Sequence, residues 1–314
     1  MKTMKKTLLM ILIAATLFGC TPRIPEENGS INVYFTHQDS VLQELENIIN
    51  ASNESVDAAL YQLSVDTLIN LLKEKNADVV VDEDSYFGYG TEIKSYGIMH
   101  NKFGIIDQKY VFSGSLNPTK KGIWEDNNNL VIIESKYLAK NYEDEFNEIK
   151  ANPDYEKNKK DKSKKTKTTQ IMLNGHLIEN YFCPEDACAA QLLEELKQAK
   201  KSIYFMTFSF TYDDIGDYMV SRRDSLDVKG IFEKRMDSEY SEYWKMLKAG
   251  MQVREDTNPA DLHHKVFIID NETVVTGSFN PSQNADTRND ENMLIIHDPE
   301  IAAKFVEEFN RIWR

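Results

Sequence analysis

The sequence has no excess of positive charge. It contains 37 lysines and arginines against 51 aspartates and glutamates, which gives a net charge of -14. This balance argues against a protein whose whole surface attracts polyanions such as DNA, so any anion-binding site must be local. With 314 residues, of which 41% are hydrophobic and 11% aromatic, the chain is expected to be globular, with one large core or two smaller ones.

Cysteine is also scarce, with 3 residues in the whole chain. Cys183 and Cys188 lie five residues apart around Pro184, where a strand end is expected to meet the first turn of a helix. A short-range disulfide between them fits an oxidising compartment. A metal site is the weaker alternative, because no second cysteine pair and no histidine pair with ligand spacing follows.

A long apolar run occurs only near the N-terminus, at residues 8–18. Residues 1–20 read MKTMKKTLLMILIAATLFGC, with three lysines, an apolar stretch too short for an ordinary transmembrane helix, and a small residue before Cys20. This is the layout of a secretory signal, and its end, LFGC, resembles a bacterial lipobox whose cysteine is lipidated, although Phe18 is bulkier than usual there. An uncleaved anchor helix is the alternative. Both place the rest outside the cytoplasm, and the first predicts a membrane-anchored lipoprotein of the cell envelope.

The second half of the chain repeats the first. The stretch VYFTHQDSVLQELENIINASNESVDAALYQLS from Val33 parallels NYFCPEDACAAQLLEELKQAKKSIYFMTFSFT from Asn180, and each reads as strand, amphipathic helix, strand. Later GIMHNKFGIIDQKYVFSGSLNP parallels DLHHKVFIIDNETVVTGSFNP. A repeat of about 150 residues is too long for a solenoid unit. The sequence therefore predicts two similar α/β domains, at residues 31–150 and 171–314.

Residues 151–170, between the copies, include seven lysines from position 157 to 167 and almost nothing apolar. We interpret this segment as a solvated, flexible linker. The alternative is that it attracts anionic headgroups or nucleic acid near the site. The copies also differ, because the first has only a short segment at 86–96 where the second has a helix-like SEYWKMLKAG and a strand-like MQVRED. The first domain is expected to have lost a helix and a strand, leaving a loop that lines the cleft.

A histidine and a lysine stand two residues apart on an apolar stretch in both halves. Side chains alternate along a strand, so His100 and Lys102 are expected on one face of HNKFGIID, with DQKY as the turn and VFSGS as the returning strand. A turn centred in DQKY places Lys102 opposite Ser115 and His100 opposite Asn117. The same count in the second half predicts a patch of His263, Lys265, Ser278 and Asn280. Two such patches, each with a costly buried cation, are hard to explain by packing.

An acidic residue follows the second patch. Glu291, in NDENMLII, begins a stretch that is expected to run beside the second hairpin and to bring its carboxylate to the other ring nitrogen of His263. The aligned residue in the first half is Asn128. Asp107 and Asp270, at the turn entrances, are expected to cap the turns and not to touch substrate.

The spacing His-x-Lys-x4-Asp-x6-Gly-Ser-x-Asn runs from His100 to Asn117 and again from His263 to Asn280. Both stretches resemble the two HKD motifs of the phospholipase D superfamily, and the duplicated halves extend the resemblance from about Ile31 to the C-terminus. The resemblance implies two α/β domains, each a mixed β-sheet flanked by helices, related by a pseudo-two-fold axis with one active site at their interface. It also implies metal-independent cleavage or transfer of phosphodiesters through a covalent phosphohistidine, with no cofactor.

The residues themselves suit this chemistry. The negative charge of a five-coordinate phosphorus can be held by Lys102 and Lys265 with the donors Ser115, Asn117, Ser278 and Asn280. No clustered carboxylates suggest a divalent-metal site, so the lysines replace the cation. One imidazole can attack phosphorus while the other protonates the leaving oxygen and later activates water. With Glu291 at His263, we expect a nucleophilic His100 and an acid–base His263.

Three functions remain open. Cleavage or exchange of phospholipid headgroups is favoured by the N-terminal anchor. A nuclease or general phosphodiesterase acting on DNA or RNA is favoured by the compact size and by similarity to small bacterial nucleases of the superfamily. The two complete motifs argue against an inactive binding module. The acidic chain counts against duplex nucleic acid as the substrate. The sequence also lacks an interleaved aromatic and basic patch of the kind that binds single strands. We therefore favour a phospholipid substrate, and a monomer, since both motifs lie in one chain.

Overall fold

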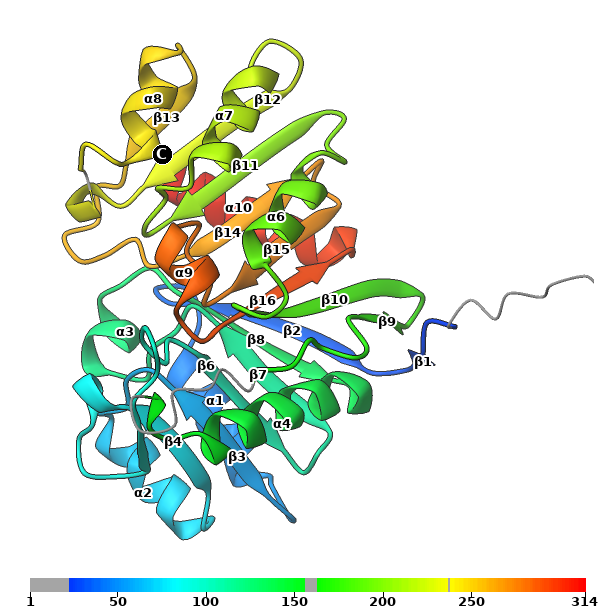
Figure 1. Ribbon diagram of the computed structural model, residues 1–314, viewed down its shortest axis with the longest axis vertical. Helices are drawn as coiled ribbons and strands as arrows, with labels where there is room; N and C mark the ends of the chain where they lie inside the picture. The colour runs from blue at the N-terminus through cyan, green and yellow to red at the C-terminus, as the bar shows by residue number, and fades with distance from the viewer. Residues whose placement is uncertain (1–22, 156–162, 237) are drawn as a thin grey trace, which may run out of the picture.

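The computed structural model describes residues 23–155, 163–236 and 238–314. The signal-like segment and Cys20 lie outside this part of the chain, as do residues 156–162 of the linker. Within it the two halves of the sequence form two β-sheets, drawn one above the other in Figure 1. In the described part of the chain, no helix combines the length and the apolar character needed to cross a membrane.

The two sheets share one strand order. Among the described residues, the first sheet runs β2 (Ser30–Phe35), β8 (Asn129–Glu134), β7 (Tyr110–Gly114), β6 (Lys102–Ile106), β3 (Val56–Leu60), β4 (Asp78–Asp82), β5 (Thr91–Ile93). The second runs β1 (Glu26–Glu27), β9 (Gln170–Leu173), β10 (His176–Cys183), β16 (Glu291–Ile296), β15 (Thr273–Gly277), β14 (Lys265–Ile269), β11 (Ser202–Thr207), β12 (Asp227–Phe232), β13 (Gln252–Glu255). Both are mixed, because β3–β4–β5 and β11–β12–β13 pair in parallel while β6 and β14 run antiparallel to β3 and β11. The expected pair of mixed α/β domains is confirmed.

Most helices cover the outer faces of the sheets. On the first sheet these are α1 (Val41–Asn50), α2 (Asp66–Glu74) and α3 (Lys120–Trp124), and on the second α6 (Cys188–Leu196), α7 (Asp213–Arg222), α8 (Glu242–Lys248) and α9 (Gln283–Thr287). The spacing of Val41, Leu45 and Ile49 places all three on one face of α1, where they are buried against the sheet. Short 3-10 turns, η1 (Glu83–Ser85) and η2 (Lys234–Met236), follow the equivalent strands β4 and β12.

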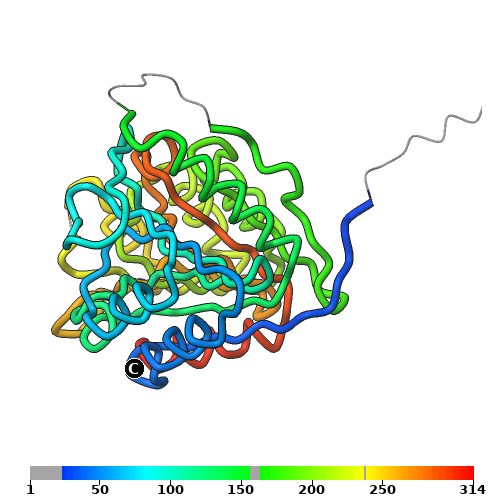
Figure 2. The backbone as a smooth tube through the Cα atoms, turned by 90° about the horizontal axis from the view of Figure 1, so that it is seen from below, coloured from blue at the N-terminus to red at the C-terminus, as the bar shows by residue number. Residues whose placement is uncertain are grey.

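A third core joins the two halves. It contains residues of both sheets together with α4 (Lys136–Ala151) and α10 (Pro299–Trp313). Tyr142 of α4 packs against Phe103 at 4.9 Å and against Phe182 of the other half at 5.0 Å between ring centroids. Figure 2 shows α10, in red, beside the blue N-terminal part of the first half. Since this apolar surface is buried only when both halves are present, the chain folds as one body.

The register of the two hairpins differs by one residue from our expectation. Gly104 pairs with Phe112, and Ile106 with Tyr110, which places Lys102 opposite the position of Gly114 and not of Ser115. Asp107 and Gln108 both have positive φ, 53° and 51°, so the chain reverses one residue earlier than a turn centred in DQKY would require. The second hairpin pairs Phe267 with Val275 and has the same offset.

The two turn aspartates bind neighbouring loops. Asp107 accepts backbone N–H groups of Asn53, Glu54 and Ser55 at 2.8 to 3.1 Å. Asp270 accepts three such groups from residues 200–202. Each aspartate therefore ties its hairpin to the loop that enters the adjacent central strand.

The first half is shortened less than we expected. In the described segment between β4 and β6 there is no α-helix equivalent to α8, but β5 takes the place of β13 beside β4. The prediction that the first domain has lost a strand was therefore wrong. Residues 26–27, before the expected start of the first domain, are also structured, since β1 pairs with β9 and so joins the sheet of the second half.

The described part of the linker contacts the protein. Lys164 N donates to Glu148 at 2.8 Å, and Thr166 Oγ1 donates to Asp186 at 2.5 Å. The expectation of a wholly solvated linker is therefore wrong for residues 163–169.

A buried pair of acids at the contact between the halves gives a stability prediction. Burial raises the pKa of Glu185 to about 8, and burial with Glu185 nearby raises that of Glu145 on α4 well above its ordinary value. The folded state therefore holds a proton that the unfolded state releases, so the free energy of unfolding must fall as the pH rises from about 5 to about 8. Glu185→Gln should flatten this fall and stabilise the protein at pH 8 by roughly 1–3 kcal/mol.

Urea unfolding at a series of pH values measures this effect. Glu194→Gln on exposed α6 surface is the matched control and should reproduce the wild-type curve. A Glu185→Gln protein that is less stable than wild type at pH 8 would contradict the buried protonated pair.

Candidate active site

The two motif histidines meet because each is held by the other half of the molecule. His100 immediately precedes the β6 hairpin, and its backbone N–H donates to the carbonyl of Asp290 at 3.0 Å. His263 precedes the β14 hairpin, and its backbone N–H donates to the carbonyl of Asn127 at 2.9 Å. Isolated bridges join the same segments, so the entry of each hairpin is fixed against the segment that begins β8 or β16 of the other half.

The side-chain partners of the histidines cross between the halves in the same way. His100 Nδ1 lies 2.8 Å from Glu291 Oε2. His263 Nδ1 lies 2.9 Å from Asn128 Oδ1 and 3.0 Å from the carbonyl oxygen of Ser115. Our expectation that Glu291 would reach His263 was wrong, because an acidic residue beside one hairpin faces the opposite half across the interface. Glu291 therefore gives no reason to assign His263 as the acid and base.

The two motif serines do not reach the cavity as we expected. Ser115 Oγ donates to Asn128 Oδ1 at 2.8 Å, and Ser278 Oγ donates to Glu291 Oε2 at 2.6 Å. Both serines are fully buried. They hold the groups that orient the histidines, so their place is behind the imidazoles and not at a bound phosphate.

Asn117 and Asn280 do line the cavity, one from each half. The Oδ1 atom of each is buried without a hydrogen-bond partner among the described residues. A buried amide oxygen without a partner is costly. Each Oδ1 can only accept a hydrogen bond, so a phosphodiester, which has no donor, could be bound only by the Nδ2 groups of these two amides.

Both motif lysines are buried. Lys102 Nζ donates to the carbonyl of His100 at 2.6 Å, and Lys265 Nζ donates to that of His263 at 2.8 Å. Each ammonium is therefore bound to the backbone of the histidine in its own motif. The lysines retain further donors, which an anion in the cavity could accept.

An aromatic ring covers each motif, which our sequence reasoning missed. Tyr61 lies 4.9 Å from the ring of His100 and 5.0 Å from the ammonium of the same motif. Phe208 lies 4.9 Å from His263 and 4.8 Å from the second ammonium. The repeat carried the signal, since Tyr61 and Phe208 occupy the same place after the strands of the aligned stretches. Such contacts favour a desolvated cation and limit the motion of the imidazole.

Burial governs the protonation of the site. It lowers the pKa of His100 to about 4 despite Glu291, and it lowers the pKa of Lys102 to about 7. Burial and the lysines lower the pKa of His263 well below its usual value, and burial with Lys102 does the same for Lys265. Burial opposes ionisation of Glu291, but His100 and Lys102 outweigh it, so its pKa is lowered. A phosphodiester anion would favour the charged lysines.

The two histidines line one cavity of about 710 Å³ at the contact of the halves. Tyr61, Phe87, Ile98, Phe208 and Met236 supply apolar wall. Phe87 belongs to the short segment 86–96, so the expectation that this segment lines the cleft is confirmed.

Charged residues concentrate on one wall of the cavity. Lys121 contacts both Asp126 and Asp261, and Arg235 also contacts Asp261. Lys120, beside them, is exposed. At the position equivalent to Asp126 the other wall has Asn289, whose Nδ2 donates to Glu291 at 3.2 Å. The cavity is therefore nearly symmetric in backbone and asymmetric in charge.

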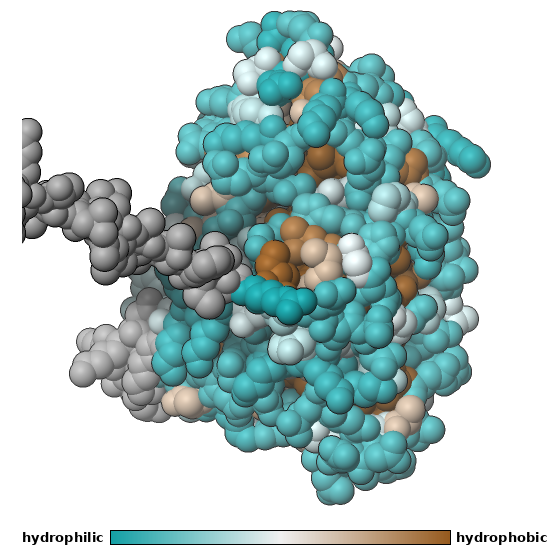
Figure 3. Space-filling model, turned by 90° about the vertical axis from the view of Figure 1, so that its right-hand side faces the viewer, coloured by the Kyte–Doolittle hydropathy of each residue, from teal (hydrophilic) through white to brown (hydrophobic). Residues whose placement is uncertain are grey.

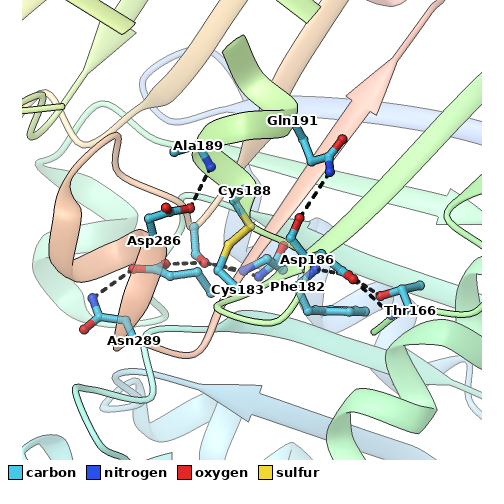
Figure 4. Close-up of a disulfide and its surroundings, with 12 residues drawn as sticks. Thr166, Phe182, Cys183, Asp186, Cys188, Ala189, Gln191, Asp286 and Asn289 are labelled. Atoms are coloured by element: carbon cyan, nitrogen blue, oxygen red, sulfur yellow. Dashed lines mark hydrogen bonds between the residues drawn. A yellow bond between two sulfur atoms is a disulfide. The ribbon is translucent and has the colours of Figure 1, made fainter. Parts of the chain in front are cut away.

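The expected disulfide between Cys183 and Cys188 is present (Figure 4). Cys183 pairs in register with Glu291 across β10 and β16. Asp286 of α9 accepts a backbone N–H from the first turn of α6, and Figure 4 shows Asp286 and Asn289 on the same side of the disulfide. The covalent link therefore stiffens the loop beside the carboxylate partner of His100.

One group of side chains in the described part of the chain brings three metal-type ligand atoms together, namely Glu179, Glu195 and His297. None of the three lines the cavity. Both ring nitrogens of His297 are bonded, to Glu179 at 3.0 Å and to Thr273 at 3.0 Å.

Residues 82–150 and 192–313 match the family described as "Cardiolipin synthase, PLD-like domain". The mitochondrial cardiolipin hydrolase of Chlamydomonas reinhardtii is 32% identical over 126 residues, which are 40% of this chain and 56% of that protein. A phospholipase D of Rickettsia typhi is 28% identical over 139 residues, 44% of this chain and 68% of that protein. The chain thus spans little more than half the length of the cardiolipin hydrolase.

A solved structure shows the same fold over most of the chain. The phosphatidylserine synthase of Haemophilus influenzae matches 90% of this chain and 86% of its own with a TM-score of 0.66 at 12% identity. Nuc, a phospholipase D family member from Salmonella typhimurium, is 33% identical over 43% of this chain and 93% of its own, with a TM-score of 0.41.

The contact between His100 and Glu291 predicts that replacing one carboxylate oxygen of Glu291 by an amide nitrogen lowers kcat strongly. Glu291→Gln keeps the shape but cannot hold the imidazole with a negative charge. If the site cleaves phosphodiesters, as its two motifs predict, kcat for bis(p-nitrophenyl) phosphate should therefore fall by on the order of 10²–10⁴-fold. Glu179→Gln makes the same change in a carboxylate bonded to His297 outside the cavity. It should leave kcat within about twofold. Equal losses in the two variants would show a general effect on folding and would remove Glu291 from the site.

Proposed function

Because the chain belongs to the family described as "Cardiolipin synthase, PLD-like domain", we propose that it is a phosphodiesterase that cleaves phospholipids without a metal ion. One observation carries the proposal: two imidazoles, each held at Nδ1 by the opposite half, face one cavity, and a buried lysine bonds to the backbone carbonyl of each histidine. Phospholipid is favoured as substrate by the relatives named cardiolipin hydrolase and phospholipase D and by the apolar wall of the cavity.

His100 is the nucleophile in this proposal, for a reason other than the one the sequence suggested. Its low pKa leaves the ring neutral at pH 7. With the Nδ1 proton donated to Glu291, the lone pair of Nε2 is free to attack phosphorus. The imidazole becomes positive as the nitrogen–phosphorus bond forms, and the carboxylate of Glu291 stabilises that charge.

His263 is the acid and base. Its Nδ1 proton is shared between two neutral oxygens, so protonation of Nε2 depends on the anion in the cavity. As the bond from phosphorus to the leaving oxygen breaks, that oxygen takes the Nε2 proton of His263. Water then loses a proton to His263 and attacks phosphorus, and the nitrogen–phosphorus bond breaks to restore His100. Lys102, Lys265, Asn117 and Asn280 neutralise and bind the phosphoryl oxygens.

The same proposal places the enzyme at a membrane outside the cytoplasm. The lipobox-like end at Cys20 supports lipid anchoring, and the disulfide Cys183–Cys188 fits an oxidising compartment. A monomer suffices, because both motifs of one chain line one cavity.

A covalent adduct tests the roles of the histidines. His263→Ala lacks both the acid of the first step and the base of the second. With bis(p-nitrophenyl) phosphate, whose leaving group needs no proton, it should accumulate an adduct at His100, detected by mass spectrometry of the acid-quenched protein. His100→Ala should form none. An adduct on His263 in the His100→Ala protein would reverse the two roles.

The substrate is tested with the full chain in EDTA. Vesicles of cardiolipin or phosphatidylcholine should release the headgroup alcohol at an undiminished rate, while single- and double-stranded DNA stay intact. Activity abolished by EDTA would overturn the metal-independent mechanism. Cleavage of DNA with intact lipid would replace the phospholipase with a nuclease.

The low pKa values of the site predict an unusual pH profile. kcat/KM reports the free enzyme, so it should fall below about pH 4, where His100 gains a proton. Its upper limb should lie at or below about pH 7, because His263, Lys102 and Lys265 must be protonated, the pKa of Lys102 is about 7 and those of the other two are lowered by burial. In the complex the phosphodiester favours charged Lys102, so the upper limb of kcat should lie at higher pH. Coincident upper limbs for kcat and kcat/KM would show that Lys102 does not sense the bound anion.

A further inference from the structure

Two exposed apolar side chains stand at the mouth of the cavity. Phe87 is 64% exposed and Met236 is 38% exposed, yet both also line the cavity. Phe87 follows η1 after β4, and Met236 ends η2 after the equivalent strand β12. The two therefore occupy corresponding places in the two halves and flank the entrance from both sides.

Further aromatic residues adjoin these two along the chain. Tyr86 precedes Phe87, and Tyr240, 72% exposed, lies shortly after Met236. Trp124, 56% exposed, ends α3, whose first turn supplies Lys120 to the cavity wall. We call Tyr86, Phe87, Trp124, Met236 and Tyr240 the aromatic rim. Tyrosine and tryptophan suit a boundary between water and hydrocarbon, because an apolar body carries a polar edge.

The rim lies on one side of the molecule. Figure 1 places α3 and α8, which border it in the chain, on the left. Figure 3 shows the opposite, right-hand face, which is mostly hydrophilic, with apolar side chains in small separate areas. Exposed apolar residues scattered singly need no explanation. Here Phe87 and Met236 line the cavity, and three exposed aromatic residues lie near cavity-lining residues in the chain, so the group is a candidate contact surface.

The charge around the entrance favours one kind of partner. Lys121 and Arg235 are paired with Asp126 and Asp261, so they offer little to an outside polyanion. Exposed Lys120 and Lys234 are matched by exposed Glu125 and Glu239. Single-stranded nucleic acid needs a positively charged groove beside the aromatic platform. A nearly neutral aromatic surface fits the interfacial layer of a phospholipid bilayer instead.

Resting on the phospholipid substrate proposed above, we propose that the aromatic rim inserts into the bilayer surface and seats the cavity directly on the headgroup layer. A lipid then enters the cavity from the bilayer without crossing water. The N-terminal anchor would hold the chain at the membrane, and the rim would set its orientation. Docking would depend on apolar insertion and not on charge, so it would persist from about 0.1 M to about 0.5 M NaCl.

Tryptophan fluorescence of the full chain on phosphatidylcholine vesicles tests the rim. Acyl chains brominated near the headgroup should quench Trp124 when the rim is unaltered. All proteins carry Trp244→Phe, because Trp244 on α8 is 49% exposed and its emission could also be quenched. In that background Trp124→Phe should lose most of the quenched emission, whereas Trp313→Phe should keep it, since Trp313 packs on Phe309 in α10. The anchor is common to all variants, so the signal reports orientation and not recruitment.

Two substitutions in the rim separate insertion from anchoring. Phe87→Ser and Met236→Ser should each lower the docking equilibrium, and with it the quenching of Trp124, by on the order of tenfold. Thr67→Ser, on exposed α2 surface, is the control and should leave quenching unchanged.

Different outcomes would overturn the docking of the rim on the bilayer and the proposed phospholipase activity. If Trp124 is not quenched while headgroups are still released, the rim does not insert into the bilayer, and the phospholipase activity stands. If Trp124 is quenched but the protein hydrolyses bis(p-nitrophenyl) phosphate and not lipid, the rim does insert into the bilayer, and phospholipid is not the substrate. Quenching that is lost at high salt, together with a change in Trp124 emission on adding single-stranded DNA, would replace the bilayer with nucleic acid.

Discussion

The exchange of partners between the two halves is the constraint on which the structure depends. His100 takes its side-chain partner, Glu291, from the second half, and His263 takes Asn128 from the first. The backbone N–H groups of both histidines are bonded across the same boundary. Neither half alone could orient its own imidazole. The central core around α4 and α10 therefore stabilises more than the fold, because it holds the two half-sites in contact.

The repeated frame carries unequal chemistry. Glu291 and Asn128 begin equivalent strands and each accepts a hydrogen bond from an equivalent serine, yet one is an anion and the other an amide. A fully buried carboxylate is costly, and here His100, Ser278 and Asn289 all bond to it. One substitution in a symmetric frame thus suffices to distinguish two histidines that the motifs make alike.

The protein is acidic, but the site we propose binds an anion. The net charge of -14 belongs to the whole chain, whereas the cavity has two buried lysines behind aromatic rings. In a desolvated site a nearby charge acts much more strongly than a distant one that salt screens. The cost of burying the lysines appears as their lowered pKa values, and a bound phosphodiester would relieve it.

The sequence by itself determined the two mixed α/β domains and the residues of both motifs, because hydrophobic periodicity and repetition are local features of the chain. It also indicated the disulfide Cys183–Cys188. Only the tertiary structure decided that Glu291 meets His100, that Ser115 and Ser278 lie behind the imidazoles, and that Tyr61 and Phe208 cover the lysines. Strand alternation predicts the face of a side chain but not the partner brought from the other half. Left-handed residues in the turn also made the hairpin loop one residue shorter than expected, which moved the register. Which half supplies each partner is a property of packing, and no pattern within one half encodes it.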